Sequence, residues 1–287
     1  MSERLPDDEL QRLLREDAPY GDLTTRSLFG IDGVGEAQGL AAFAARGAMR
    51  VACIEEAARI LELCGCKALV ETPSGHDAQA GQILLRAQGL ASDLLLGWKV
   101  AQTLTEAASG IATEAARIVG LLRAAGFAAP LTCTRKAPPG ARAMAVRAVV
   151  AGGAVMRRLG LSETLLVFPE HRVFFTSEEL AQKLKALRAA QPEKRLVVEV
   201  GNAEDAMALA QAGAEVLQLE RFSPKALAEL KASLLSQGLE PLIAPAGGVT
   251  AANALDYARA GADFLVSSAP YFAPPADVQV SIGPVRP

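Results

Sequence analysis

The sequence predicts an α/β protein in which an N-terminal α+β region is followed by an α/β barrel. With 287 residues the chain is long enough for both parts. Its composition is 51% hydrophobic but only 5% aromatic, which suits closely packed helices and argues against an all-β sandwich. Residues 1–130 mix helix and strand patterns irregularly. From residue 131, short apolar segments alternate with helical ones, as expected for parallel strands buried on both faces.

The N-terminal region carries separate helix and strand signals. Apolar residues at helical spacing predict helices over residues 8–15, 54–64 and about 91–125. The motif Ala18-Pro19-Tyr20-Gly21 ends the first helix, and Ser109-Gly110 is expected to interrupt the third. Short apolar runs predict strands over residues 36–45, 69–71 and 81–89.

Apolar segments of strand length recur in the second region. They span residues 131–134, 164–168, 196–200, 215–220, 242–246 and 264–268. Residues 202–215 and 250–263 also resemble each other, each being one helix, a glycine at its C-terminal end and the start of the next strand. Such units fit an α/β barrel, complete or incomplete, and an open doubly wound sheet is the alternative.

Composition and charge exclude several classes of function. A net charge of −3 gives no reason to expect nucleic acid or an anionic membrane as a partner. There is no apolar run of membrane-spanning length, and residues 1–8 are too polar for a secretory signal, so we expect a cytoplasmic protein without membrane insertion. His76 and His171 are the only histidines, which excludes a three-histidine zinc site. Cys64-Gly65-Cys66 lacks a second pair, so we expect reduced thiols in a packed interior.

Candidate functional residues follow the predicted barrel strands. In such barrels the residues just beyond the carboxyl ends of the strands line the active site. Cations, carboxylates, a glycine pair and hydroxyls occur at these places, and we expect them to converge. They are Thr134-Arg135-Lys136, Phe168-Pro169-Glu170-His171, Glu199, Glu220, Ala246-Gly247-Gly248 and Ser267-Ser268.

The cations indicate an anion-binding site. Thr134, Arg135 and Lys136 end a strand and precede two prolines and a glycine, and guanidinium and ammonium groups on stiff backbone suit a carboxylate or a phosphate. An ordinary basic surface loop is the alternative. Arg157 and Arg158 add two cations after a predicted helix, where solvated charges favoured by the helix dipole are the competing interpretation.

The glycine pair and the carboxylates suit a phosphate and a metal ion. Gly247-Gly248 leads straight into a predicted helix, whose free N–H groups could hold a phosphate; a plain turn is the alternative. If their strands are neighbours, Glu199 and Glu220 lie close enough to share Mg²⁺, directly or through water. Surface carboxylates paired with lysines would have the same pattern. His171 stays open between a site residue and a structural one.

Several of these motifs occur in the order and at the spacing of a known family. They are Gly21-Asp22-Leu23-Thr24-Thr25, Ser109-Gly110-Ile111-Ala112-Thr113, Thr134-Arg135-Lys136, Gly152-Gly153 with Arg158-Leu159-Gly160-Leu161, Glu199-Val200 and Gly247-Gly248. Over nearly its whole length the chain resembles the quinolinate phosphoribosyltransferases, also called nicotinate-nucleotide pyrophosphorylases.

The resemblance implies a particular organisation and chemistry. It implies an N-terminal α/β sandwich domain over residues 1–115, with return of residues 275–287, and an open α/β barrel over residues 116–274. It also implies a homodimer or larger assembly in which one subunit's N-terminal domain caps the other's barrel. The ribosyl donor implied is phosphoribosyl pyrophosphate, with Mg²⁺.

The chain departs from the family pattern around the expected acceptor. Lys99 stands where the family has arginine, Met156-Arg157-Arg158 replaces Asn-His-Arg, Phe168-Pro169-Glu170-His171 replaces Lys-Asp-Asn-His, Glu220 replaces aspartate, Ala246 replaces serine and Phe272 replaces histidine. These variants resemble the ModD branch, which is named for its association with molybdate transport and described as a pyrophosphorylase.

Residues and resemblance together predict a pentosyltransferase that moves ribosyl 5-phosphate to an acidic, quinolinate-like acceptor, linked to molybdate transport. Lys136, Glu199 and Glu220 are the expected catalytic residues, and the two carboxylates are also the expected Mg²⁺ ligands. The expected acceptor-binding residues are Lys99, Thr134, Arg135, Lys136, Arg157, Arg158 and His171, and the expected phosphate-binding residues are Ala246, Gly247, Gly248, Ser267 and Ser268. The alternatives are an authentic, decarboxylating quinolinate phosphoribosyltransferase of NAD biosynthesis and a non-catalytic binder of an oxyanion such as molybdate.

Overall fold

The computed structural model describes residues 4–29 and 37–285. Met1–Glu3 of the polar N-terminus and Glu36 of the first expected strand lie outside the described residues. The backbone divides into two units. The first comprises residues 1–116, 138–153 and 270–287, and the second comprises residues 117–137 and 154–269.

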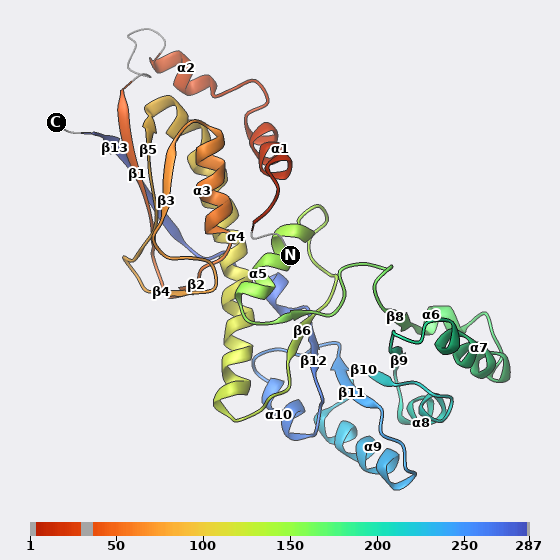
Figure 1. Cartoon of the computed structure of the whole chain (residues 1–287). Helices are drawn as coiled ribbons and strands as arrows, with labels where there is room; N and C mark the ends of the chain where they lie inside the picture. Colours follow the sequence, from red (N-terminus) through yellow and green to blue (C-terminus); the bar gives the residue numbers. More distant parts are fainter. Residues whose placement is uncertain (1–3, 30–36, 286–287) are drawn as a thin grey trace. The chain divides into compact units, whose positions relative to one another are not determined.

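A four-stranded antiparallel sheet organises the first unit (Figure 1). Its strands, in spatial order, are β13 (Val278–Pro284), β1 (Gln38–Ala45), β5 (Ile83–Leu90) and β3 (Lys67–Val70). Buried and more exposed residues alternate along β1, because successive side chains point to opposite faces of a sheet. The expected strands near residues 36–45, 69–71 and 81–89 are therefore confirmed. A separate pair is formed by β2 (Met49–Arg50) and β4 (Asp77–Ala78).

Helices complete the first unit. They are α1 (Asp7–Asp17), α2 (Leu23–Phe29), α3 (Ile54–Leu63), the first part of α4 (Ala91–Ala124), α5 (Arg142–Ala151) and the 3₁₀ turn η2 (Ala269–Phe272). The amphipathic pattern predicted α3 correctly, and its Ile54, Ala57 and Leu61 are buried. Gly97 of α4 lies against Leu61 and Cys64, which lets the two helices approach closely.

The predicted interruption of the long helix is wrong. α4 runs without a break from Ala91 to Ala124. The buried hydroxyl of Ser109 accepts a hydrogen bond from the Ala52 N–H at 3.0 Å. A Cβ placed on Gly110 would overlap the backbone of Pro274 and Pro275. Serine and glycine stand here because another segment of the chain packs closely against the helix, and both residues are compatible with helical backbone.

Parallel strands form the second unit (Figure 1). They are β6 (Leu131–Cys133), β7 (Val155–Met156), β8 (Leu165–Val167), β9 (Leu196–Val200), β10 (Val216–Glu220), β11 (Leu242–Ala246) and β12 (Leu265–Ser267). One sheet has the order β11-β10-β9-β8 and the other β12-β6-β7. Six of these strands lie where the sequence predicts them, and the two-residue β7 does not.

The two parallel sheets are arranged as an open barrel. The Asp263 N–H, just before β12, donates to the carbonyl of Ile243 in β11 at 2.9 Å, so β12 follows β11 around the ring. β12 then pairs with β6, the earliest barrel strand. In the described part of the chain no ladder joins β7 to β8, and the barrel is open there. Strands that follow one another in chain order exclude the doubly wound alternative, in which the order reverses.

Helices after the strands complete the second unit. They are α6 (Pro169–Arg172), α7 (Ser177–Ala190), α8 (Ala203–Gln211), α9 (Pro224–Ser236) and α10 (Ala254–Arg259). The interior of the sheet is apolar, with Val197, Val216, Ala244 and Val266 in one buried cluster. Within residues 4–29 and 37–285, no helix combines the length and apolar character needed to cross a lipid bilayer.

Two glycines on α4 test the reason for its continuity. Gly120 has nothing within 4 Å of an added Cβ, so Gly120→Ala should stabilise the protein by about 0.5–1 kcal/mol through helix propensity. Gly110→Ala should instead destabilise it by about 1–3 kcal/mol, because the added methyl overlaps the backbone of Pro274. Chemical denaturation of both variants measures the difference. Shifts of the same sign and size would contradict this account of Gly110.

Candidate active site at the barrel mouth

The ends of β6 and β12 are joined by hydroxyl groups. Thr134 Oγ1 lies 2.7 Å from Ser268 Oγ, and the Thr134 N–H donates to the Ser267 carbonyl at 3.1 Å. The Lys136 N–H donates to Thr134 Oγ1 at 3.2 Å, which turns the chain that carries Arg135 and Lys136. Thr134 therefore organises the cationic turn. The structure brings together the cationic motif and the late serines, as the sequence predicted.

Glu199 and Glu220 end neighbouring strands, β9 and β10. In the parallel register Gln218 lies opposite Glu199, and its amide donates to Glu199 Oε2 at 2.6 Å. Burial raises the pKa of Glu199; the Gln218 hydrogen bond lowers it and the charge of Glu220 raises it. Glu220 itself lies 3.6 Å from the exposed guanidinium of Arg221, so it is ion-paired as the surface alternative expects, but with an arginine. Glu199, in contrast, is half-buried and is bonded to an amide rather than to a cation.

Two residues that support Glu199, Gln218 and Arg172, are not among the predicted site residues. Gln218 is a buried polar residue inside an apolar strand, and that pattern is the signal by which it could have been found. Arg172 donates from Nη2 to the Glu199 carbonyl at 3.2 Å and pairs with Asp205 at 3.2 Å. Nothing in the local sequence pattern distinguishes Arg172 from an ordinary helix-end cation.

The glycine loop after β11 has left-handed backbone. Gly247 has φ 74° and Gly248 has φ 109°, conformations that glycine adopts without strain. A Cβ on Gly247 would lie 2.7 Å from Cδ of Glu220, so the absence of a side chain also makes room for this carboxylate. Successive N–H groups in such a turn can bind an anion.

The expectation that this glycine pair leads straight into a helix is wrong. α10 begins only at Ala254. The Thr250 N–H donates to the side chain of Asn253 at 2.8 Å, and the Asn253 amide donates to the Gly248 carbonyl at 2.9 Å. Ser267, which is buried, donates its hydroxyl to the Val249 carbonyl at 2.6 Å. These bonds hold the loop in place, and any phosphate here would bind the loop itself.

Arg157 and Arg158 follow strand β7 and are not solvated helix-end charges. Arg158 is only 5% exposed, and its guanidinium lies 5.6 Å from the ring centroid of Phe168. The guanidinium of Arg157 lies 5.3 Å from the ring centroid of Phe264. Nε and Nη2 of Arg157 are buried and have no hydrogen-bond partner in the described residues. Burial lowers the pKa of both arginines, and neighbouring cations lower it further. Such a group favours an anionic ligand.

His171 and Lys99 have different settings. His171 lies in α6, where Nδ1 accepts the Phe168 N–H at 2.9 Å and the ring stacks on that of Phe168 at 5.8 Å. Nδ1 is thus an acceptor, and only Nε2 is available to a ligand. Lys99 belongs to the first unit, where its ammonium donates to Gln102 at 2.7 Å and lies 4.2 Å from the Trp98 ring centroid.

The donor set of the mouth suits a cation that is shared with a substrate. Among the described residues, no three His, Cys, Asp or Glu side chains gather into a complete metal site. Two carboxylates alone match the habit of Mg²⁺, which usually takes one or two carboxylates together with substrate phosphates. Cys64 and Cys66 are free thiols, as expected.

Comparisons with known proteins agree with this architecture. Residues 111–281 match the family model of the quinolinate phosphoribosyl transferase C-terminal domain, and residues 22–109 match that of its N-terminal domain. A Rhodobacter capsulatus protein named "Putative pyrophosphorylase ModD" is 49% identical over 260 residues, which cover 91% of this chain and 98% of the relative. A nicotinate-nucleotide pyrophosphorylase [carboxylating] of Mycobacterium leprae is 31% identical, with 91% of each chain covered.

Solved structures show the same fold. The crystal structure of a nicotinate-nucleotide pyrophosphorylase from Ehrlichia chaffeensis superposes with a TM-score of 0.88 at 20% identity, covering 98% of this chain and 100% of that one. A NadC deletion mutant gives a TM-score of 0.86 at 22% identity, with 98% and 97% covered. The N-terminal sheet, the open barrel and both family models lead to one conclusion: this chain belongs to the quinolinate phosphoribosyltransferase family and is most similar, among these relatives, to its ModD-named members.

Proposed function

We propose that this protein transfers ribosyl 5-phosphate from phosphoribosyl pyrophosphate to an acidic acceptor that is related to quinolinate. The observation that carries the proposal is the separation of charge at one barrel mouth. Arg135, Lys136 and the buried Arg158 supply cations, whereas Glu199 and Glu220 supply carboxylates on neighbouring strands. A transfer between an acidic acceptor and a ribosyl group that develops positive charge needs both signs.

Each group has a role that follows from its chemistry. Lys136, Arg135 and Arg158 orient the acceptor by hydrogen bonds to its acidic groups. Glu199 and Glu220 stabilise positive charge on the ribosyl ring as its bond to pyrophosphate breaks. They are also the residues that would hold Mg²⁺, which would neutralise the departing pyrophosphate. Gln218 keeps Glu199 oriented by its 2.6 Å hydrogen bond.

The glycine loop suits the 5-phosphate of the donor. The N–H groups of Gly247 and Gly248 lie in left-handed backbone, and the loop is joined to the end of β12 by the bond from Ser267 to the Val249 carbonyl. The next residue, Ser268, has its hydroxyl held by Thr134. Ala246 contributes only backbone here. Ser267 acts indirectly, because its hydroxyl is bonded to the Val249 carbonyl.

The names of relatives favour a second candidate, authentic quinolinate phosphoribosyltransferase, in which carbon dioxide is lost after the transfer. The M. leprae relative carries the name "Nicotinate-nucleotide pyrophosphorylase [carboxylating]", and one from Archaeoglobus fulgidus the name "Probable nicotinate-nucleotide pyrophosphorylase [carboxylating]". Two differences argue that the acceptor is not quinolinate itself. Phe168 stands where the family is expected to have a lysine, and Arg157 stands where it has a histidine. An arginine and a histidine differ in charge and reach, so the two sites would not favour the same acceptor equally.

The proposal also includes a cytoplasmic location, a homodimer and a link to molybdate transport. The free thiols of Cys53, Cys64, Cys66 and Cys133 support a reducing, cytoplasmic location. A homodimer and a link to molybdate transport follow from the family resemblance and the ModD name of the similar relative. Light scattering of the purified protein would measure directly whether it is a homodimer.

Product analysis with Mg²⁺ and phosphoribosyl pyrophosphate tests the proposed function. Incubation with a panel of acidic aromatic acceptors should release pyrophosphate and yield a nucleotide detectable by mass spectrometry; nicotinate mononucleotide from quinolinate would favour the second candidate. Lys136→Met should lower kcat/KM by about 10²-fold or more, whereas Lys185→Met on α7 should not change it. If calorimetry detects no binding of the donor but tight binding of molybdate, the protein is an oxyanion binder and the enzyme proposal fails.

Two glycines with similar backbone separate local strain from crowding at the site. Gly247 has φ 74° and Gly238, after α9, has φ 71°, so alanine at either position costs about 1 kcal/mol of backbone strain. Only at Gly247 does the new methyl meet Glu220. Gly247→Ala should therefore abolish most donor binding in calorimetry, with Gly238→Ala close to the parent protein. Equal loss in both variants would show that the loop has no special role.

The hydrogen bond from Gln218 predicts a pH effect. Ionised Glu199 is the active form, so activity falls as the pH drops below its pKa, which burial places above the ordinary value. Gln218→Met removes a hydrogen bond that lowers this pKa, so the acid limb of kcat/KM should move to higher pH by about one unit. Gln211→Met, which removes an exposed amide on α8 bonded to Gln237, is the control. An acid limb that does not move in Gln218→Met would refute the role given to Gln218.

A further inference from the structure

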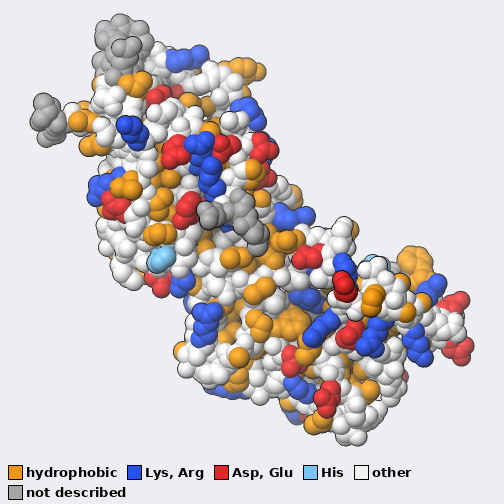
Figure 2. Space-filling view, in the orientation of Figure 1, with side chains coloured by type: hydrophobic (Ala, Val, Ile, Leu, Met, Phe, Trp, Pro, Cys, Tyr) orange, Lys and Arg blue, Asp and Glu red, His pale blue; other side chains and the backbone are white. Residues whose placement is uncertain are grey.

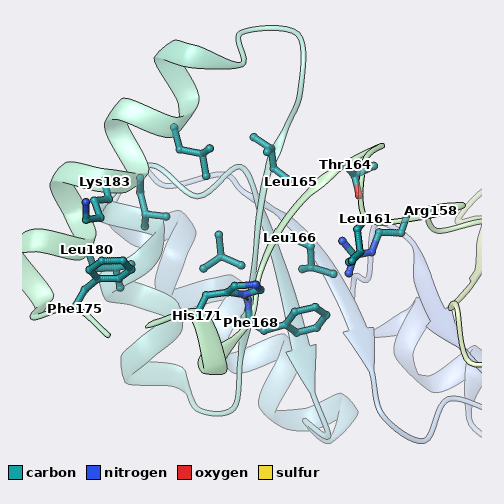
Figure 3. A pocket seen from close by; sticks show the side chains of 13 residues that line it. Arg158, Leu161, Thr164, Leu165, Leu166, Phe168, His171, Phe175, Leu180 and Lys183 are labelled. Atoms are coloured by element: carbon teal, nitrogen blue, oxygen red, sulfur yellow. Dashed lines mark hydrogen bonds between the residues drawn. The ribbon is translucent and has the colours of Figure 1, made fainter. Parts of the chain in front are cut away.

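A cavity of about 570 Å³ lies along β8, the strand at the open edge of its sheet. Its apolar wall comes from Leu165 and Val167 of β8 and from Leu180, Leu184 and Leu187 of α7 (Figure 3). Pockets for small organic ligands typically enclose about 300–1,000 Å³ and are lined mainly by hydrophobic side chains. The cavity therefore has the size and lining of a site for a small organic molecule.

The polar groups that line this cavity favour one sign of charge. They are Arg158, His171, Lys183 and the hydroxyl of Thr164, and no described Asp or Glu lines it. In Figure 3, Arg158 and Thr164 lie toward one side of the view, and Lys183 with Phe175 toward the other. Cations and donors without carboxylates indicate a ligand that is acidic as well as apolar.

Two groups of this cavity lack the partners that buried polar groups normally have. Arg158 is 5% exposed, contacts the ring of Phe168 and has another cation, Arg135, as its charged neighbour. No described carboxylate pairs with it. Thr164 Oγ1 is buried and has no hydrogen-bond partner in the part of the chain that the structure describes. Because buried polar groups are nearly always hydrogen-bonded, the Thr164 hydroxyl indicates a ligand that brings an acceptor oxygen. The cation of Arg158, which has no carboxylate partner among the described residues, favours a ligand that is acidic.

Arg158 connects the cavity to the proposed active site. It lines the cavity and is also close enough to Arg135 of the mouth for their charges to repel. Phe168, which also lines the cavity, carries the N–H that bonds to His171. An acidic group bound by Arg158 would thus have the cationic turn nearby and the leucines of β8 and α7 beside it.

We propose that this cavity receives an apolar substituent of the acceptor, and that the natural acceptor is an acidic aromatic molecule larger than quinolinate. Its acidic group binds Arg158 and the hydroxyl of Thr164, and its substituent packs against Leu165 and the leucines of α7. The inference rests on the proposed function, since it names the acceptor of that reaction. It also explains why an apolar residue, Phe168, is compatible with the site.

Calorimetry on the full chain, without donor, tests the inference. The probes are quinolinate and the same ring with an ethyl or a phenyl group at carbon 5. Burying the substituent should increase affinity about tenfold for the phenyl compound. Phe175→Asn, a change at a residue that lines the cavity and is 38% exposed, should remove most of that gain and leave quinolinate binding unchanged.

Phe174 is the matched control, because it is adjacent, 78% exposed and does not line the cavity. Figure 2 shows hydrophobic side chains on the surface near α6 and α7, the helices that flank this residue. Phe174→Asn should change the affinity for none of the three probes. Thr164→Val keeps the shape of the side chain and should weaken the binding of all three probes about three- to tenfold through the lost hydroxyl.

The outcomes separate this inference from the proposed function. If the protein binds phosphoribosyl pyrophosphate but the substituted acids bind no tighter than quinolinate, or if Phe174→Asn and Phe175→Asn weaken them equally, the cavity does not receive the acceptor. If the substituted acids bind as expected but the donor does not bind, the cavity is a site for an acidic molecule while the transferase proposal fails.

Discussion

The parallel pairing of β9, β10 and β11 is the constraint on which the rest of the candidate site depends. Parallel neighbours end at the same edge of a sheet, so their terminal residues meet although they are distant in the chain. The register that pairs Gln218 with Glu199 sets Glu220 beyond them and beside the glycine loop after β11. A shift of one residue in β10 would turn Gln218 and Glu220 to the other face and leave Glu199 without its donor.

Burial of charge gives the site its chemical character. Arg157 and Arg158 lie where burial disfavours a cation, and aromatic rings rather than carboxylates face them. Glu199 is desolvated as well and is held by an amide rather than by an arginine side chain. Had these cations and carboxylates paired with one another, the site would be more stable and less able to bind a charged substrate. Among the described residues Arg157, Arg158 and the carboxylate of Glu199 form no ion pair, which keeps them available to ligands, whereas Glu220 lies 3.6 Å from the exposed Arg221.

The open seam of the barrel extends these properties. One edge of β8 pairs with β9, and its other edge has no strand partner among the described residues. The apolar cavity lies along β8. The incomplete barrel thereby combines a charged mouth with an apolar recess, and Arg158 belongs to both. This combination is the physical basis for an acceptor that is both acidic and apolar.

The sequence by itself determined the alternation of apolar strands and helices, the strand ends that carry Lys136, Glu199 and Glu220, and the glycine pair, because these depend on local pattern. The local pattern was misleading at two places. At Ser109-Gly110 the glycine allows a close packing contact and does not break the helix. After Gly247-Gly248 the chain forms a loop held by hydrogen bonds to Asn253 and does not enter a helix directly. Only the tertiary structure decided that Arg158 is buried without a carboxylate partner in residues 4–29 and 37–285, that Gln218 and Arg172 support Glu199, and where the barrel opens. The physical reason is that burial and pairing depend on residues far apart in the chain, which no local spacing records.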